Sequence, residues 1–75
     1  MVVVGSKIWF SSVMNIDIGD MVKINTFDDG NERYRMNPNV WRVVGTMFQG
    51  GKLQLTNGMT LTAISSISAW KCSRI

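Results

Sequence analysis

The feature that most constrains this chain is a strict alternation of apolar and polar side chains over Lys52–Thr56, with Leu53 and Leu55 as the apolar residues. Because successive side chains of a β-strand point to opposite faces, a period of two predicts a strand with one buried face. Gly50-Gly51 precedes this segment and Asn57-Gly58 follows it. Asn-Gly between two alternating runs predicts a tight type I′ hairpin turn, since both residues tolerate a positive φ.

Similar patterns elsewhere predict an all-β fold of about five strands. The serines of the stretch AISSISAW (63–70) are interpreted as a turn or a helical cap. The first segment, 2–16, is rich in β-branched and aromatic residues and is interpreted as a strand, with a short helix as the alternative. The remaining predicted strands are Met21–Ile24, Val40–Val44 with Trp41 and Val43 inward, Met59–Ala63 with Met59, Leu61 and Ala63 inward, and a short strand within 68–75.

A long polar segment, 26–39, separates the predicted strand Met21–Ile24 from the strands that follow it, and it contains Gly30 and Pro38. Loops of this length in compact domains are often functional. The alternative to a functional loop is a loosely ordered excursion of the chain that has no function.

The order of these segments resembles that of the SH3-like small barrels, including the KOW and Tudor-like families. In those families a Gly-Asp-x-Val sequence opens the first barrel strand and a long loop follows, as in Gly19-Asp20-Met21-Val22 here. The resemblance covers roughly residues 17–73. It implies a single small barrel domain over residues 1–75, with an extra segment at the N-terminus. An OB-like barrel has similar patterning and stays open as a topology. Such barrels bind nucleic acid, peptides or proteins.

The residue types present argue against catalysis and against a bound cofactor. The chain has 75 residues, one cysteine (Cys72) and no histidine. A disulfide within the chain and a zinc site are therefore excluded, and the commonest general base is missing. Asp28, Asp29 and Glu32 lack the alternate spacing of a calcium loop. We expect a protein that is not an enzyme, with no metal and no cofactor.

Charge is distributed unevenly along the chain. Residues 1–32 hold two basic and five acidic residues, whereas residues 33–75 hold six basic residues and no acidic one, for a net charge of +3. Such asymmetry indicates an anionic partner, or two halves that neutralise each other in the fold.

The basic-aromatic-basic triplet Arg33, Tyr34 and Arg35, together with Arg42 and Lys52, is the predicted nucleic-acid site. The cations would contact phosphates and the tyrosine would stack on an unpaired base. This predicts a small regulatory protein that acts on nucleic acid or on nucleic-acid machinery.

The alternative is an adaptor or inhibitor, phage- or plasmid-encoded, that binds a host protein complex. Six methionines and three tryptophans are many for this length. Trp41 and Trp70 are expected to fill the barrel. Trp9 and Phe10 are the predicted partner contact, because interface hot spots are enriched in tryptophan. A homodimer through this segment would also enlarge a thin core.

The N-terminal stretch MVVVGSKIWF has no basic segment before its apolar run and is too short to span a bilayer. We expect no membrane association and a cytoplasmic location.

Overall fold

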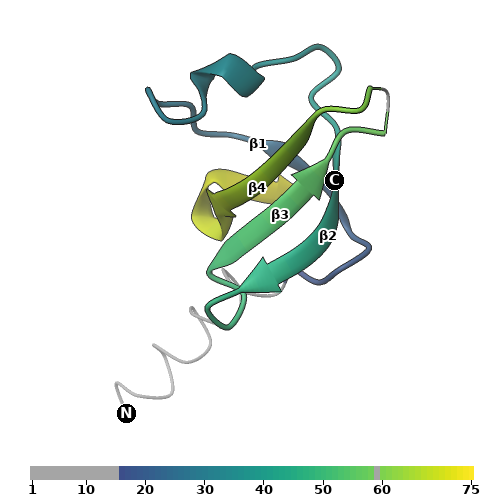
Figure 1. Ribbon diagram of the computed structural model, residues 1–75, viewed down its shortest axis with the longest axis vertical. Coiled ribbons are helices and arrows are strands. Elements are labelled where there is room, and N and C mark those ends of the chain that lie inside the picture. Colours follow the sequence, from purple (N-terminus) through teal and green to yellow (C-terminus); the bar gives the residue numbers. More distant parts are fainter. Residues whose placement is uncertain (1–15, 59) are drawn as a thin grey trace.

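The computed structural model describes residues 16–58 and 60–75, and these residues form an all-β fold of five antiparallel strands in one sheet. Figure 1 shows β2, β3 and β4 as curved strands side by side, as expected for a small barrel-like fold. The predicted all-β class is therefore confirmed. The sheet order is β4-β3-β2-β1-β5, and the elements are β1 (Met21–Ile24), the 3₁₀ turn η1 (Glu32–Tyr34), β2 (Trp41–Met47), β3 (Lys52–Thr56), β4 (Ala63–Ser68), the 3₁₀ turn η2 (Ala69–Lys71) and β5 (Cys72–Arg74).

The core forms from one face of every strand. Trp41, Val43, Leu53, Leu55 and Val22 are fully buried, as the alternation over β1, β2 and β3 predicts. Around them pack the buried side chains of Ile16, Ile24, Ile64, Ile67, Ala69 and Cys72.

The strand predicted over Met59–Ala63 is wrong, because β4 begins only at Ala63. Leu61 and Ala63, both predicted inward, are exposed, Leu61 fully so, and Met59 lies outside the described residues. In β4 the two buried residues are Ile64 and Ile67, three positions apart. The register with β3 shifts between Leu53 and Leu55, so that two serines of β4 lie opposite one residue of β3. This β-bulge keeps both isoleucines inward and removes the alternation that reveals a strand.

The turns also differ from the prediction. Asn57 and Gly58 do not adopt the positive φ of a type I′ turn. Asn57 is instead buried, and its backbone amide donates to the carbonyl oxygen of Thr62 across a longer loop. The left-handed conformation occurs in the β2–β3 turn, at Phe48 (φ 54°), Gln49 (φ 58°) and Gly50 (φ 88°).

Asn39 extends the pairing between β1 and β2 with its side chain. Its amide nitrogen donates to the carbonyl oxygen of Ile24 (2.7 Å), and its Oδ1 accepts from the Ile24 backbone amide (3.3 Å). The same Oδ1 accepts from the indole Nε1 of the buried Trp41 (2.8 Å). The end of the long loop is thereby fixed to the core.

Candidate functional site

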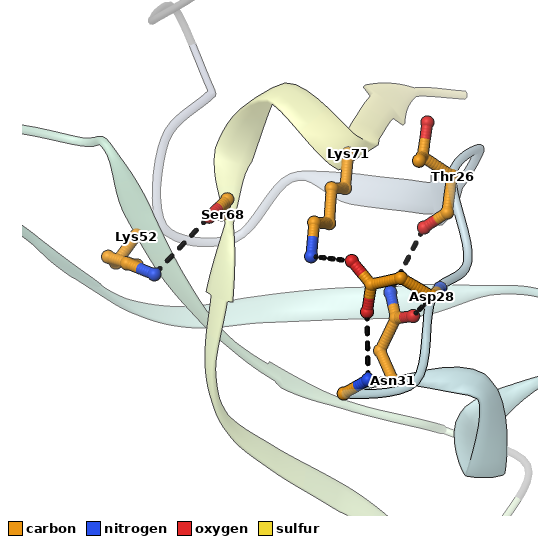
Figure 2. Close-up of polar contacts among 7 residues, drawn as sticks. Thr26, Asp28, Asn31, Lys52, Ser68 and Lys71 are labelled. Atoms are coloured by element: carbon orange, nitrogen blue, oxygen red, sulfur yellow. Dashed lines mark hydrogen bonds and ion pairs between the residues drawn. The ribbon is translucent and has the colours of Figure 1, made fainter.

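The long loop between β1 and β2 is held in place by polar contacts around one buried residue, so it is not the loosely ordered excursion that the sequence left open. Asn31 is buried; its Oδ1 accepts from the Asp28 backbone amide (2.7 Å) and its Nδ2 donates to the Thr26 carbonyl (3.0 Å). Asp28 Oδ1 accepts from the backbone amide of Gly30 (2.9 Å). Figure 2 shows these contacts around Asn31. They fix the start of η1.

An ion pair joins this loop to η2. Lys71 Nζ lies 2.5 Å from Asp28 Oδ2, and the lysine side chain is mostly buried. The hydrogen bond from Lys71, assisted by the Gly30 amide, lowers the pKa of the Asp28 carboxyl. The charge of Lys71 is therefore already paired with a carboxylate of the long loop.

Arg33 and Tyr34 form a short stack on the core. The Tyr34 ring packs edge-on against Trp41 with a centroid distance of 6.2 Å. The Arg33 guanidinium lies over the Tyr34 ring at 4.9 Å, within cation–π range. One ring face of Tyr34 is thus already occupied, and the group that faces outward is the exposed guanidinium of Arg33. A planar guanidinium can itself stack on a base or bind a phosphate.

Arg35 is engaged by groups of its own loop. Its Nε and one terminal nitrogen donate to the two Glu32 oxygens at 2.7 and 3.0 Å. Its guanidinium also lies 4.2 Å from the Phe27 ring centroid. This pairing lowers the pKa of Glu32 and raises the pKa of Arg35, in both cases chiefly through the hydrogen bond between the two side chains. A ligand phosphate would have to compete with Glu32 for Arg35.

Arg42 and Lys52, the other two residues of the predicted site, lie at opposite ends of the β2–β3 hairpin. Arg42 pairs with Thr56, whereas Lys52 pairs with Met47 beside the turn. η1 lies beyond the end of the sheet opposite to this turn (Figure 1). The structure therefore brings Arg33, Tyr34 and Arg35 together but places Lys52 away from them.

The strands β1 to β5 carry basic residues and no acidic one. Their basic residues are Lys23, Arg42, Lys52 and Arg74. Within the described ranges, Lys23 and Arg42 are exposed and form no ion pair. The Arg74 guanidinium nitrogen Nη1 lies 3.7 Å from Asp20 Oδ2. The acidic residues of 16–58 and 60–75 all lie in the turn before β1 and in the loop after it.

Two exposed aromatic residues were not predicted. Trp70, expected in the core, is 62% exposed, and Phe48 in the β2–β3 turn is 76% exposed. Trp70 lies in the 3₁₀ turn η2, where strand alternation does not apply, and no sequence pattern indicates its exposure. Trp9 and Phe10, the predicted partner contact, lie outside the described residues.

The thiol of Cys72 is not an activated nucleophile. Cys72 is buried, and burial raises its pKa to about 11, against a weaker opposing effect of Lys71. Among the residues that the structure describes, no three His, Cys, Asp or Glu side chains gather as metal ligands do. The same residues include no helix long and apolar enough to cross a bilayer.

Comparisons of the chain with protein-family models, with curated proteins and with solved structures find no match.

Proposed function

We propose that this chain is a small non-enzymatic binding protein that acts on nucleic acid or on nucleic-acid machinery. The observation that carries the proposal is the separation of charge in the fold. The five strands carry basic residues only, while the described acidic residues lie in the segments that flank β1. A surface of one sign of charge raises the local concentration of an oppositely charged partner.

The proposed contact residues are Arg33 in η1 and Arg42 at the neighbouring end of β2, while Asp28 and Glu32 of the η1 loop are paired with Lys71 and Arg35. Arg33 and Arg42 are exposed and free of ion pairs to the described residues, so both can release counterions from phosphates. The Tyr34 ring packs against the Arg33 guanidinium, so that face of the ring is not available to stack on a base. Arg35 is expected to contribute less, because Glu32 already binds it through two hydrogen bonds.

Fluorescence anisotropy with short single- and double-stranded DNA and RNA, over a salt series, tests this proposal. We expect binding that weakens steeply with salt. Arg33→Ala should reduce the slope of log K against log salt by about 0.7 to 0.9, the value of one phosphate contact. Arg35→Ala is the matched control in the same turn and should reduce it by less. Absence of binding to every oligonucleotide at low salt would refute the proposal.

A second candidate, binding of a protein partner, is favoured by exposed apolar side chains on adjacent segments. Ile18 is 64% exposed and Val44 is 47% exposed. The Gly19 amide donates to the Val43 carbonyl (2.8 Å), which holds the turn of Ile18 beside β2. If this surface binds a protein, Val44→Asp should abolish capture of that partner without changing the circular dichroism of the fold.

A further inference from the structure

Two exposed aromatic side chains lie on segments that are tied together by hydrogen bonds. The Gly51 amide donates to the Phe48 carbonyl (3.0 Å), and the Gly51 carbonyl accepts from the Ala69 amide (2.9 Å). The β2–β3 turn and η2 are therefore neighbours through Gly51. Trp70, the central residue of η2, and Phe48 are both mostly exposed.

Two lysine side chains are held near the two ends of η2. Lys52 Nζ donates to Ser68 Oγ (3.2 Å), two residues before Trp70, and Lys71 Nζ lies 5.5 Å from the Trp70 ring centroid. Figure 2 shows the Lys52–Ser68 and Lys71–Asp28 contacts on either side of η2. No acidic residue occurs anywhere from 33 to 75, so β2, β3 and η2 contribute only the cations Arg42, Lys52 and Lys71, and β4 is uncharged. We refer to the surface formed by Phe48, Lys52 and Trp70 as the η2 patch.

The backbone at Phe48 is strained for a residue of its type. Its φ of 54° lies in the left-handed region, where glycine and asparagine are normal and a bulky side chain is an outlier. Burial does not explain the phenylalanine, because three quarters of it is exposed. Strain that persists at an exposed aromatic residue is a reason to look for a ligand there.

We propose that the η2 patch is a site for single-stranded nucleic acid, in which an unpaired base stacks on the Trp70 indole and Lys52 binds a neighbouring phosphate. The inference rests on the proposed function and adds a second contact area, on η2 and the β2–β3 turn. Stacking requires a base with a free face, which a duplex does not offer. Of the described aromatic residues, Trp70 and Tyr34 each have a cation over the ring, but Trp70 is mostly exposed whereas Tyr34 packs against the buried Trp41.

Charge favours this ligand over a protein. β2, β3, β4 and η2 hold no carboxylate, and the Asp28 carboxylate that contacts η2 is paired with Lys71. Lys52 is therefore the cation that complements a phosphate backbone. Phe48 lies in the β2–β3 turn, which Gly51 joins to η2. Its ring would give a second apolar surface for the next base or sugar of the strand.

The test compares a fluorescein-labelled single strand of about 12 nucleotides, a length within the range that small barrels cover, with the duplex of the same sequence. Trp70→Ala should weaken single-strand binding by about ten- to a hundred-fold, the effect of losing one stacked base, and should change duplex binding by less than two-fold. Trp70→Phe, which keeps a ring, should recover most of the affinity. Phe48→Gly, which also relieves the strained turn, should weaken single-strand binding several-fold.

Leu61→Ala is the matched surface control, because Leu61 is fully exposed on a different loop, and it should bind as the parent does. Circular dichroism of each variant checks the fold. If Trp70→Ala binds single strands as tightly as the parent while Arg33→Ala weakens them, the inference is overturned and the proposed function stands. If the parent binds no oligonucleotide, both are overturned. If Trp70→Ala leaves nucleic-acid binding intact but abolishes a protein contact, the patch belongs to a protein and the inference is overturned.

Discussion

Asn39 is the residue whose replacement tests most directly how the long loop is attached to the sheet. Its side chain satisfies three groups: the amide and the carbonyl of Ile24 and the indole nitrogen of Trp41. Ile24 and Trp41 are buried to 2% and 0% exposure, so water does not readily replace these partners. Asn39→Ala would leave up to three polar groups without a partner.

The expected loss follows from the cost of each unpaired group. A buried donor or acceptor that loses its partner costs about 1–3 kcal/mol. Asn39 itself is half-buried, and water can reach part of the space that alanine leaves. We therefore expect Asn39→Ala to lower the free energy of unfolding by about 2–4 kcal/mol, a large share of the roughly 4–11 kcal/mol typical of a domain of this size.

Asn37→Ala is the matched control, because Asn37 lies in the same loop and its exposed side chain bonds to none of the described residues. Urea unfolding, followed by tryptophan fluorescence and circular dichroism, measures both variants against the parent. A loss for Asn39→Ala no greater than that for Asn37→Ala would refute the assignment of these three hydrogen bonds as stabilising.

Asn39→Asp adds a test of the direction of the hydrogen bonds. The introduced carboxylate would face the Ile24 carbonyl oxygen, to which the native amide donates. Only the protonated carboxyl can donate there, so its pKa should be higher in the folded chain than in the unfolded chain. The folded chain then binds the proton more tightly, and stability relative to the parent should rise as the pH falls through the raised pKa. A stability difference that is independent of pH would contradict the assignment.

Two further predictions concern the titrating groups near η2. Burial raises the pKa of the Cys72 thiol from 9.0 to about 11, so iodoacetamide at pH 8 should alkylate the native chain about a hundred-fold more slowly than the urea-unfolded chain. The same shift means that stability falls as the pH rises above 9, and equal alkylation rates would contradict it. Lys71 lowers the pKa of Asp28, so the stabilisation by this pair is present above pH 3.8 and is lost as the pH falls through the lowered pKa. The difference in melting temperature between the parent and Asp28→Asn should therefore shrink below pH 3.8, and a constant difference would show that the pair contributes nothing.

The sequence predicted the fold where the strand ladder is regular and failed where it is not. β3 was predicted with its observed bounds, because Leu53 and Leu55 alternate with polar residues without interruption. The β1 prediction succeeded for the same reason. In β4 the bulge places Ile64 and Ile67 three residues apart, which is a helical spacing, and the intervening serines suggest a turn.

The candidate site was predicted only in its local part. Arg33, Tyr34 and Arg35 are consecutive, so any fold keeps them together. The Glu32–Arg35 pair joins residues three apart and becomes predictable once the segment is known to form a helical turn. The Lys71–Asp28 pair joins residues 43 positions apart, and no local pattern indicates it. Lys52 was placed with the loop because strand positions give the face of a residue but not the end of the sheet at which it lies.

The β4 bulge also sets how the chain enters η2, the 3₁₀ turn that carries Trp70. With Ile64 inward, an unbroken alternation would turn residues 66 and 68 inward and Ile67 outward. The extra serine shifts the phase by one residue, so that Ile67 points inward and the chain then enters η2, where Ala69 is buried and Trp70 is exposed. The same shift places Ser68 opposite Lys52, where its hydroxyl accepts from the lysine ammonium. One irregularity in an edge strand thus keeps Ile67 in the core and brings the Lys52 ammonium to the start of η2, whose exposed Trp70 supplies the ring that the proposed site for a single strand requires.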